Sequence, residues 1–313
     1  MSFSHVPVLL RETIDALRIR PDGTYVDCTA GGGGHSSEIL RRLTTGTLTD
    51  IDRDPQAIET LRTRFAGQDN VRILQGNFFD LEALLAEQGI SGADGILADL
   101  GVSSHQLDTA ERGFSFHTDA PLDMRMSMQG ISAADVVNTY PKAQLQRILY
   151  AYGEEKFAPS IASAIARARE TAPIETTLQL AQIISSAVPA AARRDGHPAR
   201  RTFQALRIEV NGELEKLDEA VQGMFRVLNP GGRLCIITFH SLEDRIVKKR
   251  FAALCTGCTC PPDFPVCVCG KKAEGRLPMK AVAPSQEELQ ENNRSRSAKL
   301  RVIEKISNDE KGE

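Results

Sequence analysis

The sequence predicts an α/β fold with a doubly wound, mostly parallel sheet. Three observations support this. Short β-branched runs alternate with helix-like stretches over the first hundred residues, a glycine-rich turn follows the first run, and the same alternation returns after a long helical stretch. A chain of 313 residues exceeds one typical domain. We therefore expect either one large fold or a core that carries an inserted domain.

Four apolar, β-branched runs predict the first strands. They cover residues 24–28, 47–51, 71–74 and 95–98. Helix-like stretches occupy 36–43 and 55–65, and the second opens with Asp54 as its cap and Pro55 at its first position. Strands that alternate with helices in this way form a parallel sheet.

The strand signal disappears from about Ser132 to Val188. Segments rich in Ala, Leu, Ile and Arg replace it, separated by prolines, and this pattern predicts helices. We expect a helical insertion over 109–208, between a first core segment, 1–108, and a second, 209–313.

The α/β pattern resumes in the second core segment. Apolar residues at helical spacing over 214–228 predict a helix, which the turn Asn229–Gly232 would end. The next strand is expected at 233–239. The apolar run 300–303 predicts an antiparallel strand at the edge of the sheet.

Composition narrows the class of protein. Hydrophobic residues make up 41% and charged residues 25%, the balance of a soluble globular protein. No stretch approaches the ~20 apolar residues of a membrane span, and the first residues lack the apolar run of a signal peptide, so we expect a cytoplasmic protein. The net charge is -3, yet Arg245 to Arg301 holds 12 Lys and Arg against 5 Asp and Glu. That local excess is suited to a polyanion.

A glycine-rich turn marks the expected cofactor site. Gly31 to Gly34 follow the first predicted strand, and Asp52 ends the second about twenty positions later. Glycines let the backbone turn tightly and approach a ligand, and an acidic residue at this distance binds ribose hydroxyls. The layout predicts a site for a cofactor that contains ribose.

Two cofactors fit this layout, a nicotinamide dinucleotide and S-adenosylmethionine. The dinucleotide pattern started at Gly31 would place its last small residue at Ser36, an imperfect match, and His35 would crowd the pyrophosphate. Asp99, at the end of the fourth strand, is better suited to an adenine or amino group than to hydride transfer. These features favour S-adenosylmethionine. A nicotinamide oxidoreductase and a pure RNA-binding module remain the other classes.

Several motifs together resemble the RsmH (MraW) family, and the resemblance runs from His5 to about Glu304. They are Asp99–Ser104, Gln106–Asp108, Glu111–Phe116, Pro121–Met126 and Phe239–Val247. The resemblance implies a Rossmann-like class I methyltransferase sheet with an inserted helical domain and S-adenosyl-L-methionine as cofactor. It also implies methylation of the exocyclic N4 of a cytidine in the decoding region of 16S ribosomal RNA. The alternative acceptor is an amine of another nucleic acid or of a small molecule.

The resemblance further implies partners and cofactor contacts. The partner is 16S ribosomal RNA, within the small ribosomal subunit and away from membranes; homodimerisation stays open. The cofactor contacts that it implies are Gly33, Gly34, His35, Asp52, Phe78, Asp99 and Gln106. Ordinary core packing is an equally common role for a phenylalanine such as Phe78.

Candidate catalytic residues follow the fourth and fifth strands. The exocyclic amine of cytosine is a poor nucleophile and must be aimed at the methyl group, so we expect a hydrogen-bond acceptor there. Asp99, Ser103 or a backbone carbonyl is our hypothesis, although Asp99 could instead be engaged with the cofactor. His240 lies at the carboxyl edge where α/β sites form, and its alternative role is to cap the next helix.

A basic cluster lies at the end of the predicted insertion. Arg200, Arg201 and Arg207 belong to it, with Arg193 and Arg194 nearby, and a helical domain there could grip RNA while presenting one extruded base. We therefore expect Arg200, Arg201 and Arg207 to bind substrate. A solvated face is the ordinary alternative.

Five of the seven cysteines crowd into a loop at 255–269, and this clustered, odd set argues against a disulfide framework. They are Cys255, Cys258, Cys260, Cys267 and Cys269. Thiolates at this density can surround zinc, but C-x-C is tighter than the usual C-x-x-C. We assign no metal ligands at this stage, since reduced thiols or a redox-sensitive loop fit as well. Cys28 and Cys235 are expected in the core.

Overall fold

The computed structural model describes residues 7–190, 196–261, 266 and 268–307. It divides into two compact units, one of residues 1–101 and 215–313 and one of Val102–Leu214. The second unit extends beyond the expected insertion, 109–208, at both ends. At its start, the short helix α5 (Ser104–Asp108) packs on the 3-10 turn η2 (Ala110–Arg112), so both belong to this unit.

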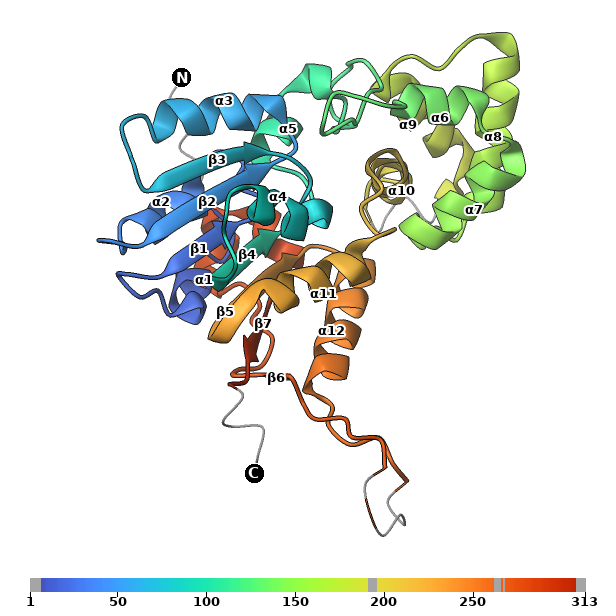
Figure 1. Cartoon of the computed structure of the whole chain (residues 1–313). Coiled ribbons are helices and arrows are strands. Elements are labelled where there is room, and N and C mark those ends of the chain that lie inside the picture. Colours follow the sequence, from blue (N-terminus) through green and yellow to red (C-terminus); the bar gives the residue numbers. More distant parts are fainter. Residues whose placement is uncertain (1–6, 191–195, 262–265, 267, 308–313) are drawn as a thin grey trace. The chain divides into compact units, whose positions relative to one another are not determined.

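The first unit is built on one sheet of seven strands in the order β3-β2-β1-β4-β5-β7-β6 (Figure 1). The strands are β1 (Thr24–Asp27), β2 (Thr47–Asp52), β3 (Val71–Gln75), β4 (Ala93–Asp99), β5 (Leu228–Thr238), β6 (Gly275–Arg276) and β7 (Lys299–Lys305). The first five run parallel, and β7 is antiparallel to β5. The predicted fold class is confirmed.

Two details of the sheet differ from the sequence expectation. β7 is not the edge strand, because β6 pairs with it in antiparallel register. β5 begins at Leu228 rather than at 233, since Leu228 already pairs with Ala93 and the register then shifts between Ala93 and Gly95. The turn Asn229–Gly232 is therefore an irregular start of the strand.

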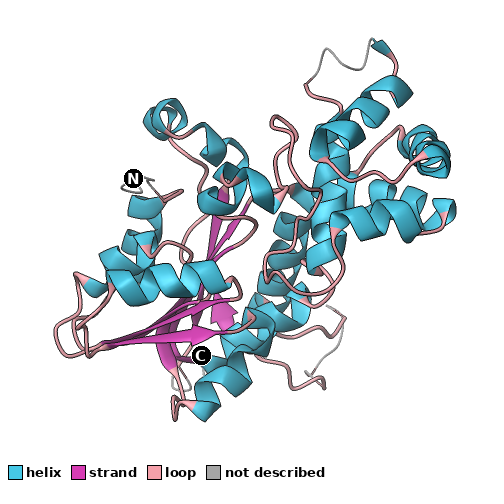
Figure 2. Ribbon diagram, turned by 90° about the horizontal axis from the view of Figure 1, so that it is seen from above, coloured by secondary structure: helices cyan, strands magenta, loops and turns pink. Residues whose placement is uncertain are grey.

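Helices cover both faces of the sheet (Figure 2). They are α1 (Leu10–Leu17), α2 (Gly34–Leu40), α3 (Pro55–Arg64), α4 (Leu81–Glu87), α11 (Leu217–Val227), α12 (Ser241–Cys255) and α13 (Gln286–Glu291). α1 packs on α2, and α11 packs on α4 and α12. The side chain of Asp54 accepts a hydrogen bond from the Gln56 amide at 3.0 Å, which confirms the predicted cap of α3.

The core of this unit lies between the central strands and their helices. Tyr25, Leu48, Leu97, Ile237 and Leu300 are buried in one cluster that joins five strands. Burial of such side chains contributes about 1.5–3 kcal/mol each. The carboxyl ends of β1, β2 and β4 therefore sit on a rigid support.

The second unit is helical, as the sequence predicts. It contains α5, α6 (Ala133–Thr139), α7 (Lys142–Gly153), α8 (Ala158–Thr171), α9 (Thr177–Ala187) and α10 (Ala199–Asn211). These helices enclose a separate apolar cluster, which includes Val136, Leu145, Ile161, Leu180 and Leu206. Pro141 caps α7 and Pro159 lies in the first turn of α8, where a missing N–H costs nothing.

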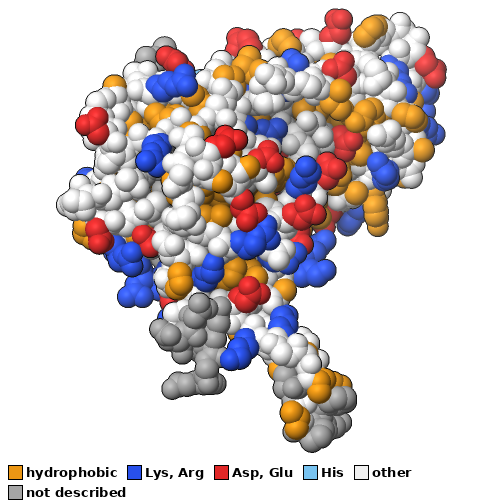
Figure 3. Space-filling model, in the orientation of Figure 1, with side chains coloured by type: hydrophobic (Ala, Val, Ile, Leu, Met, Phe, Trp, Pro, Cys, Tyr) orange, Lys and Arg blue, Asp and Glu red, His pale blue; other side chains and the backbone are white. Residues whose placement is uncertain are grey.

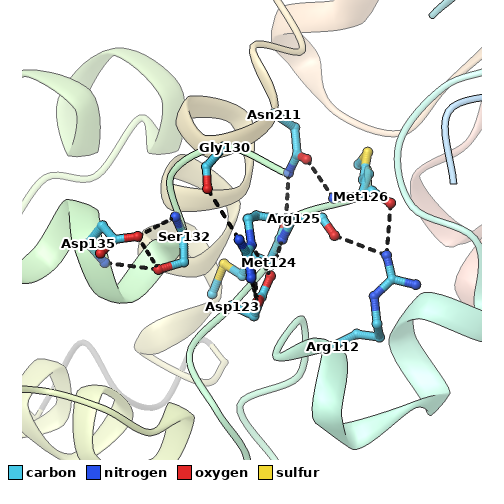
Figure 4. A network of polar contacts seen from close by, with 9 residues as sticks. All are labelled: Arg112, Asp123, Met124, Arg125, Met126, Gly130, Ser132, Asp135 and Asn211. Atoms are coloured by element: carbon cyan, nitrogen blue, oxygen red, sulfur yellow. Dashed lines mark hydrogen bonds and ion pairs between the residues drawn. The ribbon is translucent and has the colours of Figure 1, made fainter. Parts of the chain in front are cut away.

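A polar network ties the segment 121–126 to α10 inside this unit (Figure 4). The buried Arg112 donates from Nη2 to the carbonyls of Arg125 and Met126, at 3.0 and 2.9 Å. Asn211 donates to the Met124 carbonyl at 2.7 Å and accepts from the Met126 amide at 2.9 Å. Two of the motifs that carry the family resemblance thus form one structural element.

Across the described ranges, no helix combines the length and the apolar character needed to cross a bilayer.

Candidate functional site at the carboxyl edge of the sheet

The glycine turn lies between β1 and α2. Gly33 is the N-cap of α2 in the left-handed conformation, with φ 78°, and its carbonyl accepts the Ser37 amide at 2.9 Å. A Cβ on Gly33 would lie 2.9 Å from the Arg64 side chain, and one on Gly34 would lie 2.3 Å from Pro7. A Cβ on Gly32 would meet nothing within 4 Å. The chain's own packing therefore requires glycine at 33 and 34 but not at 32.

Asp52 closes the turn from the end of β2. Its Oδ2 accepts the Gly31 amide at 2.8 Å, and its Oδ1 accepts the Asp54 amide at 2.8 Å. Burial raises the pKa of Asp52, and these two hydrogen bonds oppose the rise. Each carboxylate oxygen keeps a further lone pair, so Asp52 can still accept hydrogen bonds from a ligand.

Two further carboxyl groups lie beneath the turn. Asp27 and Asp50 are partners in the register of β1 and β2, and both are buried. Asp27 accepts from the Ser36 hydroxyl at 2.9 Å and from the Thr29 amide at 3.1 Å. Burial raises the pKa of Asp27 to about 6, and burial with the charge of Asp27 raises that of Asp50 well above its usual range. The sequence analysis missed this pair, whose only signal is an acidic residue within each apolar strand.

Asp99 ends β4 and faces His35. Its amide donates to the Thr29 hydroxyl at 2.6 Å, and its Oδ2 lies 4.0 Å from His35 Nδ1. The other ring nitrogen, Nε2, lies 3.2 Å from the Val8 carbonyl, and since a carbonyl only accepts, Nε2 carries a proton. The imidazole is therefore oriented with Nδ1 toward the carboxyl group.

Asp99 also has an unsatisfied atom. Its Oδ1 is buried and has no hydrogen-bond partner among the described residues. Burial, and then the charges of Asp27 and Glu243, raise the pKa of Asp99 well above its usual range. A buried oxygen without a partner costs about 1–3 kcal/mol, so a ligand that donates a hydrogen bond here would be stabilised.

These residues fit a cofactor with a ribose and amino groups. Asp52 offers lone pairs to hydroxyls beside the turn, and Asp99 offers an unpaired acceptor two strands away, with β1 between β2 and β4. Phe78 follows β3 in the turn η1 (Phe78–Asp80), edge to face with Phe79 at 4.8 Å between centroids. Phe78 also lines a pocket with Ala220 and Gly223 of α11. Its contact with adenine stays a prediction.

Ser103 and Gln106 belong to the second unit, where they cap α5. The Ser103 hydroxyl accepts the Gln106 amide at 3.2 Å, and the Gln106 side chain accepts the Ser103 amide at 3.1 Å. Gln106 is buried, with 5% of its surface exposed. This reciprocal cap fixes both side chains. Their predicted roles in catalysis and cofactor binding stay predictions.

His240 is the N-cap of α12, the alternative that the sequence analysis left open. Its Nδ1 accepts the Glu243 amide at 3.4 Å, and its Nε2 lies 3.0 Å from Glu243 Oε1. Glu243 is buried and also accepts the Phe239 amide at 2.8 Å. The geometry gives Nδ1 of His240 a hydrogen-bond partner, whereas the buried Nε2 has none among the described residues. A substrate-facing role stays a prediction.

The three predicted substrate arginines differ in their surroundings. Arg207 donates from Nε and Nη2 to the two carboxylate oxygens of Glu213, each at 2.9 Å, and 16% of its side chain is exposed. Arg200 and Arg201 are exposed in the first turn of α10, where Arg201 donates to the Glu154 carbonyl at 3.1 Å. Arg193 and Arg194 lie outside the described residues. The geometry therefore favours Arg200 and Arg201 over Arg207 for binding phosphate.

An aromatic cluster beside these arginines was not predicted. The Phe116 ring stacks on the His197 ring with centroids 4.5 Å apart, and it also meets His117 at 4.4 Å and Phe203 at 5.3 Å. Both histidines are exposed. Burial and the charge of His117 lower the pKa of His197, so it is neutral at pH 7. The rings come from distant segments, and no sequence spacing joins them.

Many basic residues of the segment 245–301 are paired. Arg250 pairs with Asp218, Arg276 with Glu304, and both Lys299 and Arg301 with Asp244. Figure 3 shows basic and acidic side chains interspersed on the face in view. The local excess of positive charge is therefore a weaker sign of a polyanion site than the sequence suggests.

The two isolated cysteines lie in the core, as predicted. Cys28 and Cys235 are both buried, and burial raises the pKa of Cys235 to about 12. Neither thiol is activated as a nucleophile. Cys267 of the cysteine-rich loop lies outside the described residues.

The chain is similar to known proteins over nearly its whole length. The sequence model of the MraW methylase family matches residues 2–306. A relative from Clostridium botulinum (strain Kyoto), called Ribosomal RNA small subunit methyltransferase H, is 54% identical over 98% of this chain and 100% of its own length. One of the same name from Symbiobacterium thermophilum is 53% identical over 98% of each chain. A solved structure of an rRNA methylase from Streptococcus thermophilus aligns over 97% of this chain and 100% of its own, with 11% identity and a TM-score of 0.44.

The motifs found in the sequence, the seven-stranded sheet and the match over nearly the full length lead to one conclusion: the chain belongs to the MraW methylase family.

Proposed function

We propose that this protein transfers the methyl group of S-adenosylmethionine to the exocyclic N4 of a cytidine in the decoding region of 16S ribosomal RNA. The observation that carries the proposal is the 54% identity, over 98% of the chain, to relatives named for methylation of small-subunit ribosomal RNA. The family resemblance of the motifs supports N4 of cytidine as the acceptor atom. An amine of another nucleic acid is the alternative.

Different residues of the first unit bind different groups of the methyl donor. S-adenosylmethionine supplies an activated methyl group on a sulfonium. The carboxylate of Asp52 is held in place by the amides of Gly31 and Asp54, so its remaining lone pairs can bind ribose hydroxyls. The buried oxygen of Asp99 binds an N–H group. The carboxyl groups around the turn also favour a cationic ligand.

Asp99 can act in either of two ways. Its unpaired oxygen can hold an amino group of the donor, or it can accept a hydrogen bond from the target amine. Methyl transfer places a positive charge on the amine nitrogen, and one of its protons must then leave. Because its pKa is raised, Asp99 is a stronger base than an ordinary carboxylate and suits the second role. Separate measurements of donor affinity and of turnover distinguish the two.

The start of α10 offers features that bind RNA. Two arginines in the first turn of a helix oppose the helix dipole, an arrangement that a bound phosphate would relieve. The exposed His197 ring, stacked on Phe116, provides a surface on which an unpaired base can stack. Both features lie within the second unit, which we propose as the RNA-binding domain.

The acceptor is tested by nucleoside mass spectrometry of ribosomal RNA from cells that lack the gene. We expect N4-methylated cytidine to disappear and to return with the wild-type gene but not with an Asp99→Asn variant. Persistence of the modified nucleoside without the gene would overturn the proposed acceptor. Its return with the variant would overturn the role of Asp99 alone.

The RNA surface is tested by neutralising Arg200 and Arg201 together with glutamine. Loss of two phosphate contacts should lower the slope of log K against log salt by about 1–2 and weaken binding at low salt. Arg62→Gln, at an exposed position on α3, is the matched control and should change neither. An unchanged slope in the double variant would place the RNA elsewhere.

A further inference from the structure

Three cysteines meet in the loop between α12 and β6, and none of them is among the residues assigned to methyl transfer. The Sγ atoms of Cys258, Cys260 and Cys269 all lie within 4.8 Å of one another. Those of Cys258 and Cys269 are 3.7 Å apart. A disulfide would require about 2.05 Å, so these atoms are neighbours without a covalent bond.

The spacing matches a tetrahedral metal site. Two sulfurs that each lie about 2.3 Å from a zinc ion at the tetrahedral angle are roughly 3.8 Å apart. The distance between Cys258 and Cys269 agrees with this value, and Cys260 completes one face of the tetrahedron with small adjustments. Within the described part of the loop, three thiolates are thus available, and a water molecule or another group would take the fourth position.

Backbone amides support the same assignment. Three N–H groups donate to the sulfurs, each at 3.4 Å: Thr259 to Cys269, Cys260 to Cys258, and Val268 to Cys260. Each sulfur therefore accepts at least one amide hydrogen bond. Such bonds orient the ligands, as surrounding donors do in metal sites.

Three cysteine sulfurs this close together can act as ligands of a single cation. Sulfur ligands in tetrahedral geometry select zinc over magnesium or calcium, which prefer oxygen. We propose that Cys258, Cys260 and Cys269 bind a zinc ion that stabilises this loop.

The side chains of Val266 and Val268 are 70% and 73% exposed and lie between the ligands in sequence. Hydrophobic side chains are visible on the loop in Figure 3. The metal would hold these side chains on the surface without a hydrophobic core beneath them.

Metal analysis of the full-length protein, purified under reducing conditions without chelator, tests the proposal. We expect about one zinc ion per chain by elemental mass spectrometry. After chelation, added cobalt(II) should give the visible absorption of a tetrahedral thiolate site. Cys258→Ser and Cys269→Ser should each lose the stoichiometric zinc and the cobalt spectrum.

Cys255→Ser is the matched control, because Cys255 lies in the last turn of α12 and outside the cluster. It should retain the zinc. All three variants should bind S-adenosylhomocysteine as the wild type does, so failure of the metal proposal is distinguishable from failure of the proposed function. No zinc or cobalt binding by the reduced wild type would overturn the proposal. So would loss of two hydrogens in the intact mass of freshly purified protein, which would indicate a disulfide instead.

Discussion

Asp94 and Asp99 stand near opposite ends of β4 in opposite surroundings, and the isosteric change to asparagine should separate them. Asp94 is fully engaged: it accepts from the Thr24 amide at 2.9 Å and from the Asn229 side chain at 3.0 Å, and it pairs with Arg20 at 3.0 Å. Burial alone would raise the pKa of Asp94, but these partners lower it. Asp99 has a buried oxygen without a partner and a raised pKa.

The two changes should therefore have opposite effects on the free protein. Asp94→Asn weakens hydrogen bonds to a charged acceptor, each worth about 1.5–3 kcal/mol, so the free energy of unfolding should fall by about that amount. Asp99→Asn removes a carboxyl group whose charged form is disfavoured by burial and by neighbouring carboxyl groups. Near neutral pH, its free energy of unfolding should stay unchanged or rise by about 1 kcal/mol.

Ligand binding should show the reverse order. If Asp99 accepts a charge-assisted hydrogen bond from the donor, its loss costs about 1.5–3 kcal/mol, or roughly 10- to 100-fold in Kd. Asp94 lies at the amino end of the strand, far from the glycine turn, so Asp94→Asn should bind normally. Urea unfolding measures the stabilities, and calorimetric titration with S-adenosylhomocysteine measures Kd.

Two results would refute this reasoning. If Asp99→Asn destabilises the protein as much as Asp94→Asn does, the carboxyl group of Asp99 is already satisfied in the free protein. If Asp99→Asn binds S-adenosylhomocysteine and turns over like the wild type, the residue belongs to neither the cofactor site nor the chemistry. Normal binding with slow turnover would assign Asp99 to the target amine.

Further predictions follow from single contacts. Gly33→Ala should lower the free energy of unfolding by about 2–4 kcal/mol through backbone strain and the clash with Arg64, whereas Gly32→Ala should be neutral; equal urea midpoints for the two would contradict the turn geometry. Arg207→Gln leaves the carboxylate of Glu213 largely buried and unpaired, which should cost about 3 kcal/mol, and a change in RNA affinity at unchanged stability would show the opposite role. The pKa of Asp27 rises from 3.8 to about 6 on folding, so the folded state binds more protons in that window and stability falls as pH rises through it. Between pH 4 and 6 the wild type should lose more stability than Asp27→Asn, and parallel pH profiles in urea unfolding would show that Asp27 does not titrate there.

The sequence predicted most elements because each rests on a local signal. The four strands of the first hundred residues are apolar runs with glycine or polar ends, and α3 starts where Asp54 can cap it. The edge strand was misplaced because β6 is two residues long and carries no pattern of its own. Its position is decided by pairing with β7.

The features of the candidate site also fall into two groups, those that the sequence predicted and those that only the tertiary structure decided. Residue types and spacing predicted the glycine turn and the acidic ends of β2 and β4, since a turn and two strand ends are local features. The resemblance of several motifs to the RsmH (MraW) family implied the family and its methyl donor. Tertiary structure alone decided which groups are already engaged: Arg207 with Glu213, His240 with Glu243, and Asp52 with two amides, whereas one oxygen of Asp99 is left over. It also decided that Asp27 and Asp50 share one buried region and that three cysteine sulfurs converge. These facts depend on distances between segments far apart in the chain, and hydrogen-bond satisfaction and pKa are properties of those distances, not of the residue types.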